Sequence, residues 1–492
     1  MSDRPNILLL CTDQQRWNSL TCYGAAGAST PNLDRLAAQG ARFENCYVQN
    51  PICGPSRASL FTGMYARNHG EWANGVTLPQ DRKMFTRVLS DAGYDCGMVG
   101  KQHLAPCDSW QTEPRRDDGY RVWEWSHGKN HRSVQNVYHT WLRKHYPQVF
   151  AQTFPDKGAN ENTHIANMSR TGTPIDEVPP ECHYTHWVAE RSIDFITTPR
   201  KADERFCLVA NFFDPHHPFG VPQAYRDRID AANIPPPQTA PGELESKPAP
   251  HRAYSRTSYG GEAPGFQDYT ADEIAEIRAV YYAMITFIDD EVGRILDALE
   301  ASGQAENTLV IFTSDHGEML GDHAQLMKGP MMYDAAIRVP LLMRWPERIA
   351  PGRVIGELVQ WIDLSATCLD VAGARPMDQQ QGASLMPLAL GRAVDWRDWA
   401  LCEYRDSGIA EAPAIHTTMF RTGDWKLVLW HGEPATSRPG EGELYNLADD
   451  PDELENLYDR PAHRANRRAM KRHLIDILAE TDPRNAQRHH PA

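Results

Sequence analysis

The segment from Pro51 to Gly63, PICGPSRASLFTG, places a thiol and a guanidinium where they could hold an anion. Pro55 suits the first turn of a helix and Gly63 suits its end, so we expect a short helix with Cys53 at its entrance. The free backbone N–H groups and the positive dipole end at that point favour an anion. Arg57 follows Cys53 by four residues and would lie on the same helix face. Together these groups would suit a tetrahedral oxyanion.

Four short, mostly apolar runs each lead into polar residues that could bind a cation or an anion. The runs are residues 6–11, 94–99, 206–213 and 308–314, and the polar residues that follow them are Asp13 and Gln14, Lys101 and His103, His216, and Asp315 and His316, respectively. Buried strands that alternate with helices indicate a parallel, doubly wound α/β sheet. Ligands of such sheets bind outside the carboxyl ends of the strands. We therefore expect these residues to meet Cys53 at one sheet edge.

The connecting helices are marked by their end signals and by their periodicity. We expect helices over residues 30–40, 86–93 and 184–196, and a long helix that begins at the capping box of Thr270 and Glu273. Apolar residues recur at steps of three and four from Ile277 to Leu299. The stretch between residues 105 and 267 shows little periodicity, and we expect its loops to shape the substrate pocket.

The pattern changes near Asp395. A turn and strand over residues 421–430, a strand over 443–447 and an amphipathic helix over 464–480 follow without crossover helices between the strands. This order indicates a small antiparallel sheet with one packed helix. We predict a catalytic α/β domain with a large, mainly parallel sheet over residues 1–394, and a smaller C-terminal α+β subdomain over residues 395–492.

Composition limits the kinds of partner that the chain can bind. The 492 residues carry a net charge of −15, which argues against nucleic acid or an anionic membrane surface as partner. An anionic substrate would need a local cluster of cations. The chain starts without a signal pattern and has no apolar run of membrane-spanning length, so we expect a cytoplasmic protein. The ten cysteines include no Cys-x-x-Cys pair, and most would be free core residues.

The run Cys53-Gly54-Pro55-Ser56-Arg57 resembles the Cys-x-Pro-x-Arg signature of the type I sulfatases, which belong to the alkaline phosphatase-like superfamily. The likeness covers nearly the whole chain, because the strand-end segments and the C-terminal subdomain match as well. It implies that a formylglycine-generating or equivalent maturation enzyme oxidises Cys53 to formylglycine, whose hydrate is the nucleophile. It also implies six catalytic residues, which are Cys53, Arg57, Lys101, His103, His216 and Lys328.

The resemblance further implies one divalent metal ion. Its ligands would be Asp13, Gln14, Cys53, Asp315 and His316. Many family members have a second Asp at the position of Gln14 and an Asn at that of His316. In having Gln14 and His316 at these positions, the chain resembles the branch of the family that contains choline sulfatases and phosphonate monoester hydrolases. We expect Ca²⁺. Mn²⁺ and Mg²⁺ are alternatives, because this ligand set has one carboxylate fewer and one nitrogen more than that of many family members.

In the implied mechanism, Lys101, Lys328, Arg57 and the metal hold the sulfate oxygens. His216, alone or with Lys328, protonates the leaving oxygen, and His103 removes the proton of the second hydroxyl so that sulfate is expelled. Roles outside the active site stay open for two of these residues. Lys328 could be a solvated surface residue, and His216 could lie in a proline-bounded turn. His217 is expected to point away from the site. His183, His186, Asn74 and the tryptophans near Trp110 are pocket candidates without a defined role.

The sequence thus predicts a sulfuric ester hydrolase that cleaves small sulfate monoesters, in particular aryl sulfates. One alternative is a phosphonate monoester hydrolase or phosphodiesterase with the same nucleophile, which Gln14 and His316 favour. Lys101 and His103 favour a sulfatase, because the phosphonate branch typically lacks that pair. The other alternative is an unprocessed protein that binds a sulfated ligand and keeps an intact thiol at Cys53. We also expect a homodimer.

Overall fold

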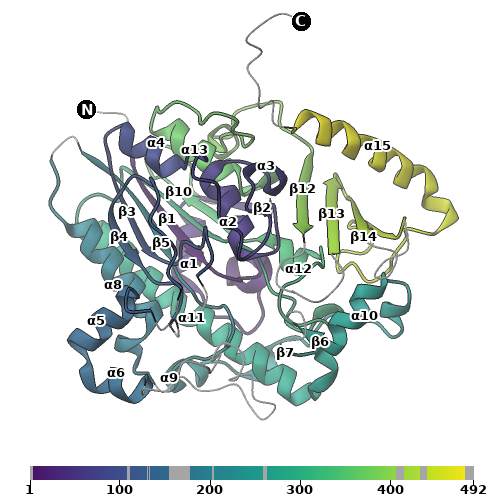
Figure 1. The fold of residues 1–492 in the computed structure, drawn as a ribbon, viewed down its shortest axis with the longest axis horizontal. Helices are drawn as coiled ribbons and strands as arrows, with labels where there is room; N and C mark the ends of the chain where they lie inside the picture. Colours follow the sequence, from purple (N-terminus) through teal and green to yellow (C-terminus); the bar gives the residue numbers. More distant parts are fainter. Residues whose placement is uncertain are drawn as a thin grey trace, which may run out of the picture.

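The computed structural model describes residues 4–107, 111–129, 131, 133–154, 178–201, 204–258, 263–405, 415–432 and 440–482. Its larger sheet, several strands of which are labelled in Figure 1, has the strand order β11-β2-β10-β8-β1-β5-β3-β4, with β9 paired to β2. These strands are β1 (Asn6–Thr12), β2 (Ala41–Tyr47), β3 (Tyr94–Gly100), β4 (Tyr120–Trp125), β5 (Arg205–Asn211), β8 (Thr308–Ser314), β9 (Arg338–Val339), β10 (Leu341–Arg344) and β11 (Arg353–Gln360).

The direction of the strands confirms a mainly parallel sheet. Strand β1 pairs in parallel with β5 and β8, and β3 pairs in parallel with β4 and β5. The short strands β10 and β9 depart from this pattern: β10 runs antiparallel to both β8 and β2, and β9 runs antiparallel to β2. The carboxyl ends of β1, β3, β5 and β8 therefore lie at one edge, as the sequence predicts.

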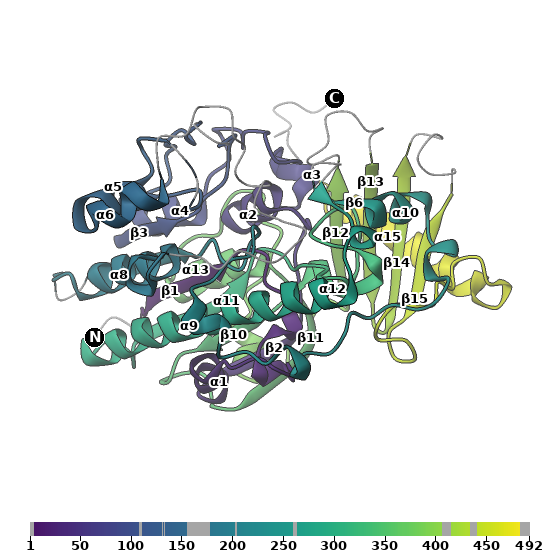
Figure 2. The same cartoon turned by 90° about the horizontal axis from the view of Figure 1, so that it is seen from below.

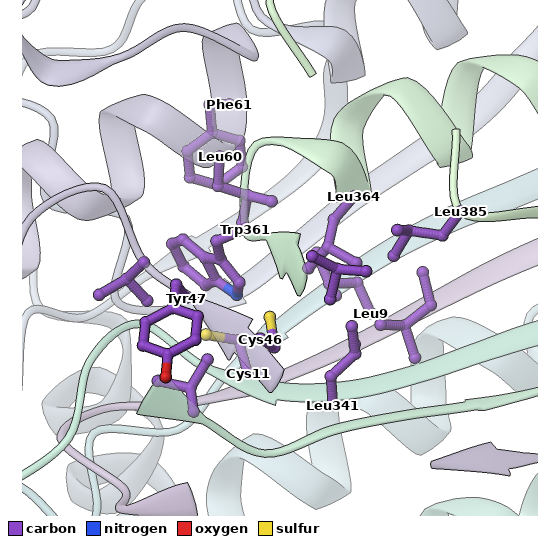
Figure 3. Close-up of a cluster of buried hydrophobic side chains, with 14 of the residues drawn as sticks. Leu9, Cys11, Cys46, Tyr47, Leu60, Phe61, Leu341, Trp361, Leu364 and Leu385 are labelled. Atoms are coloured by element: carbon purple, nitrogen blue, oxygen red, sulfur yellow. The ribbon is translucent and has the colours of Figure 1, made fainter. Parts of the chain in front are cut away.

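Helices cover both faces of this sheet. The principal ones are α1 (Pro31–Ala38), α2 (Cys53–Thr62), α4 (Phe85–Asp91), α8 (Tyr184–Thr197), α11 (Ala271–Ala301) and α13 (Asp363–Val371). Successive side chains of a strand point to opposite faces. Accordingly, Leu9 of β1 packs in the cluster that holds Leu60 of α2 and Leu364 of α13 (Figure 3), whereas Leu8 packs in the cluster of α1, α8 and α11. Both faces of β1 are thus buried.

The C-terminal strands form the predicted antiparallel sheet. It has the order β12 (Trp399–Arg405), β13 (Ile415–Thr422), β14 (Trp425–Gly432) and β15 (Gly442–Asn446), and it carries α15 (Arg464–Glu480). Figures 1 and 2 show this sheet beside the larger one, with α15 lying along it. Leu474 and Ile477 of α15 share an apolar cluster with Phe420 and Leu427, and Tyr65 from the larger part joins it.

Short elements fill the connections. They are α3 (Ala66–His69), α5 (Val137–His145), α6 (Pro147–Thr153), α9 (Gln223–Arg226), α10 (Ala249–Arg256), β6 (Thr257–Ser258), β7 (Ala263–Pro264), α12 (Asp334–Ile337) and α14 (Met386–Ala389). Within the described residues, no helix has both the length and the apolar character that crossing a bilayer requires.

Candidate active site

Cys53 is the first residue of α2, and its thiol lies at the carboxyl ends of the central strands. The sulfur atom is 3.2 Å from Nε2 of His316, 3.6 Å from Oδ1 of Asp13 and 2.8 Å from Nζ of Lys328. Asp13 comes directly after β1, and Asp315 and His316 come directly after β8. The structure therefore brings together residues that are distant in the chain, since Lys328 alone follows Cys53 by 275 positions.

The donor atoms around Cys53 fit a divalent cation. Ligand atoms of Asp13, Cys53, Asp315 and His316 all lie within 4.8 Å of one another, and these side chains are buried. Gln14 lies beside them, because its backbone N–H donates to Oδ1 of Asp315 at 3.0 Å. Its side-chain Oε1 is buried and has no hydrogen-bond partner among the described residues, which leaves it free to act as a ligand. Carboxylate and amide oxygens suit a hard cation such as Ca²⁺.

Arg57 and Lys101 balance the charge of the two carboxylates. Arg57 donates from Nε to Oδ2 of Asp315 at 2.8 Å and from Nη1 to the Lys101 carbonyl at 2.7 Å. Lys101 donates from Nζ to Oδ2 of Asp13 at 2.6 Å. Burial alone would raise the pKa of Asp13, but Lys101, Lys328 and Arg57 outweigh it and hold that pKa below its ordinary value. Asp13 is therefore ionised at neutral pH.

Lys328 is buried and is not a surface lysine. Its Nζ lies 2.8 Å from Nε2 of His216, in addition to its contact with Cys53. Nδ1 of His216 donates to the His217 carbonyl, so Nε2 is left as the acceptor for the Lys328 ammonium. Burial and the nearby Lys328 lower the pKa of His216 well below its ordinary value. The imidazole of His216 is therefore neutral.

His103 lies next to the cluster but makes no hydrogen bond to Cys53 among the described contacts. Its backbone N–H and that of Leu104 donate to the buried carboxyl group of Glu113, at 2.8 and 2.6 Å. Burial and the charges of Lys101 and Arg57 lower the pKa of His103 well below its ordinary value. The ring is thus a neutral base held near the cationic cluster.

The environment of Cys53 favours a negative charge at this position. Burial and the Asp13 carboxylate raise the pKa of the thiol, but Lys101, Lys328 and His316 outweigh them and lower it to about 6. At the helix terminus, the backbone N–H of Gly54 already donates to Oδ1 of Asn74 at 3.0 Å. Asn74 therefore pairs one of the N–H groups at the start of α2.

The prediction that His217 points away from the site is wrong. Its Nδ1 lies 3.2 Å from Nε2 of Gln14, and its ring stacks on that of His216 with 4.0 Å between centroids. The error came from treating this segment as extended, whereas the His216 N–H bonds back to the Phe213 carbonyl and closes a turn. Glu318 also acts on the site, because its carboxylate accepts the Gln14 side-chain N–H and orients that amide.

Other pocket candidates lie elsewhere or outside the described residues. His186 pairs with Glu291 of α11 at 3.0 Å. His183 accepts the Thr185 backbone N–H at the start of α8. Trp110 falls outside the described residues. Glu318 follows the end of β8 just as Asp315 does, so its position in the sequence is a signal for a residue at the site.

The family model described as Sulfatase matches residues 5–374. This chain belongs to the sulfatase family. A second model, described as N-sulphoglucosamine sulphohydrolase, C-terminal, matches residues 321–480. The match confirms the resemblance that the signature around Cys53 indicates, and the chain is a sulfatase-family enzyme.

Relatives and solved structures agree with this assignment. The uncharacterized sulfatase YidJ of Escherichia coli strain K12 is 32% identical over 483 residues, which cover 96% of this chain and 87% of that protein. An arylsulfatase of Clostridium perfringens strain 13 is 30% identical over 96% of this chain and 94% of its own length. The crystal structure of the phosphonate monoester hydrolase of Agrobacterium radiobacter matches with a TM-score of 0.80 and 27% identity, covering 97% of this chain and 96% of the other. The alkaline phosphatase-like fold is thereby confirmed.

Proposed function

We propose that this sulfatase-family enzyme hydrolyses sulfate monoesters, in particular aryl sulfates, with formylglycine derived from Cys53 as the nucleophilic residue. The observation that carries the proposal is a cluster of three cationic side chains at one buried thiol, in a chain with a net charge of −15: one contacts the sulfur, and the other two pair with the carboxylates of Asp13 and Asp315 beside it. The cations are those of Lys328, Lys101 and Arg57. Such a cluster favours a tetrahedral oxyanion that the rest of the protein repels.

The carboxylates of Asp13 and Asp315 would hold the metal ion together with Gln14, His316 and the group at position 53. When bound, the cation would lower the pKa of a hydroxyl at position 53 and stabilise charge on the sulfate oxygens. Oxygen donors outnumber nitrogen donors in this set, so we propose Ca²⁺ as the physiological ion. The imidazole of His316 keeps Mn²⁺ and Mg²⁺ as alternatives.

Lys328 and His216 act together on the leaving group. Nε2 of the neutral His216 accepts from the Lys328 ammonium at 2.8 Å, so the lysine carries the proton and the histidine holds it in place. Lys328 would donate that proton to the departing oxygen as the S–O bond to it breaks. Lys101 and Arg57 would meanwhile hold the remaining sulfate oxygens.

His103 would act in the second half of the reaction. A hydrate at position 53 keeps one free hydroxyl after the other has accepted the sulfuryl group. His103, as a neutral buried base, would accept the proton of this hydroxyl. The aldehyde C=O bond then forms as the bond to sulfate breaks, and no water attack on the ester is required.

Phosphonate monoester or phosphodiester hydrolysis is the second candidate function. The fold match to the Agrobacterium radiobacter enzyme, together with Gln14 and His316, favours it. Lys101 and His103 favour sulfate, because both lie beside the cluster at Cys53 and the sequence likeness ties this pair to sulfatases. The test compares kcat/KM for an aryl sulfate and for an aryl phosphonate monoester with the same leaving group. A large preference for the phosphonate would overturn the proposal.

Mass spectrometry of the peptide that contains Cys53, from enzyme made in its natural host, tests the nucleophile. We expect an aldehyde mass, no turnover by Cys53→Ala and normal turnover by Cys22→Ser, which alters a thiol outside the site. An intact thiol with sulfated-ligand binding and no turnover would instead indicate a binding protein. The maturation enzyme, a homodimer, a cytoplasmic location and a domain boundary after residue 394 stay predictions.

A further inference from the structure

A second cluster of metal-ligating side chains lies next to the proposed active site. It consists of His103, Cys107 and His127, and one ligand atom from each lies within 4.8 Å of the others. The Cys107 sulfur is 3.1 Å from Nδ1 of His127. The rings of His103 and His127 meet edge to face, with 4.7 Å between their centroids. The three residues come from two separate loops, one after β3 and one after β4.

An unsatisfied buried atom points to a ligand in this cluster. Nδ1 of His103 is buried and has no hydrogen-bond partner among the described residues, although buried polar atoms are normally paired. The loop that carries His103 is fixed in place, because Glu113 accepts the backbone N–H groups of His103 and Leu104. His127 is half-buried, so an ion can reach the cluster from solvent.

Two neighbouring residues, His131 and Glu113, already make other hydrogen bonds. Nε2 of His131 contacts the Gln111 carbonyl at 3.1 Å, and its Nδ1 accepts the Ser133 N–H at 3.3 Å. The Glu113 oxygens are already used by backbone N–H groups and by the indole N–H of Trp125 at 3.0 Å. The ligand atoms that the cluster itself brings together are therefore one sulfur and two imidazole nitrogens.

We propose that His103, Cys107 and His127 bind Zn²⁺, and that bound zinc inhibits the enzyme by engaging His103. Two imidazoles and a thiolate are typical zinc ligands, and three protein ligands leave a fourth position open. Ca²⁺ and Mg²⁺ prefer oxygen, so the two neighbouring clusters select different ions. On binding, the S–H bond of Cys107 breaks, a sulfur–zinc bond forms and the proton passes to the buffer. The imidazoles donate lone pairs, and nothing is oxidised or reduced.

The binding test uses the full enzyme with excess Ca²⁺ present to fill the oxygen-rich site. Zinc retained under these conditions is measured by competition with a chromophoric chelator. We expect one tightly bound zinc per chain, which Cys107→Ser and His127→Gln lose and the controls Cys22→Ser and His145→Gln keep. Co²⁺ in place of zinc should give a thiolate charge-transfer band that Cys107→Ser abolishes. The site is refuted if both cluster variants retain zinc as tightly as the unmodified enzyme, or if excess Ca²⁺ displaces all bound zinc.

The inhibition test rests on the proposed function, in which His103 is a base in turnover. Zinc should lower kcat on an aryl sulfate, and His127→Gln should need at least about tenfold more zinc for the same loss. Equal sensitivity of His127→Gln and the unmodified enzyme would overturn the inhibitory role. Zinc binding at the cluster in a protein without sulfatase turnover would support the site and refute the proposed function, so the two failures are distinguishable.

Discussion

Replacing Lys101 by methionine separates a catalytic role of this residue from a structural one. The Lys101 ammonium lies 2.6 Å from Oδ2 of Asp13, and the two side chains are 1% and 0% exposed. Methionine keeps the apolar stem and removes the charge. Lys101→Met should therefore lose a buried ion pair and, under the proposed function, one of the cations that hold the sulfate oxygens.

The two losses have different expected sizes. At this separation the Coulomb attraction is about 6 kcal/mol with an effective dielectric constant of about 20. Removing one partner of a buried ion pair typically costs about 3–5 kcal/mol of unfolding free energy. We expect Lys101→Met to lose about 3 kcal/mol of unfolding free energy, at the lower end of this range, because Arg57 still lies 3.4 Å from the same Asp13 oxygen. Loss of one group that stabilises transition-state charge should lower kcat by a factor of about 10²–10³.

Lys426 provides a matched control in the smaller sheet. It is also a fully buried lysine, with Nζ 2.8 Å from Asp334 and 2.6 Å from Glu453. Lys426→Met should cost a similar unfolding free energy without changing the turnover of each folded molecule. The assay combines urea unfolding with kcat on an aryl sulfate at saturating Ca²⁺, corrected for the folded fraction. The reasoning fails if folded Lys101→Met turns over at the normal rate, or if Lys426→Met loses as much turnover.

Three further predictions concern the metal site, the nucleophile helix and pH. Gln14→Ala should weaken Ca²⁺ binding by about 10–100-fold in calorimetry, because it removes a ligand oxygen; unchanged affinity would exclude Gln14 as a ligand. Gly54→Ala should cost about 1–3 kcal/mol in urea unfolding, because the new Cβ would lie 2.9 Å from Oδ1 of Asn74. Burial lowers the pKa of His139 from 6.5 to about 4, so its stabilising effect is complete above pH 6.5 and is lost as pH falls through about 4. His139→Gln should reduce the change in unfolding free energy between pH 6.5 and about pH 4, and His145→Gln should not.

Much of the site could be predicted because it depends on strand ends. The apolar run before Asp13 and the run before Asp315 became adjacent parallel strands, so both carboxylates had to reach the same edge. Lys101 followed in the same way from β3. These predictions needed only the alternation of helices with buried strands and no knowledge of side-chain contacts.

The remaining parts of the fold and site carried weaker local signals. Strand β2 mixes polar and apolar residues in the run ARFENCY, and β10 has only four residues, so neither gives a long unbroken apolar run. Lys328 lies in a loop well beyond the end of β8, and only the sequence likeness indicated it. The position of His217 depends on the turn closed by the His216 N–H, and this turn cannot be inferred from the spacing of the two histidines.

The charge of the site limits how it can choose among substrates. Three cations, those of Arg57, Lys101 and Lys328, face two carboxylates in the cluster, and a divalent ion would add to the positive excess. A sulfate monoester and a phosphonate monoester carry the same single negative charge, so the number of cations cannot separate them. Discrimination between the two esters must come from the positions of the cations relative to the substrate oxygens. Lys328 with His216 faces the leaving oxygen in the proposed mechanism, and Lys101 faces the non-reacting oxygens. The proposed preference for sulfate is therefore a difference of degree, and activity on both esters is the expected behaviour of this site.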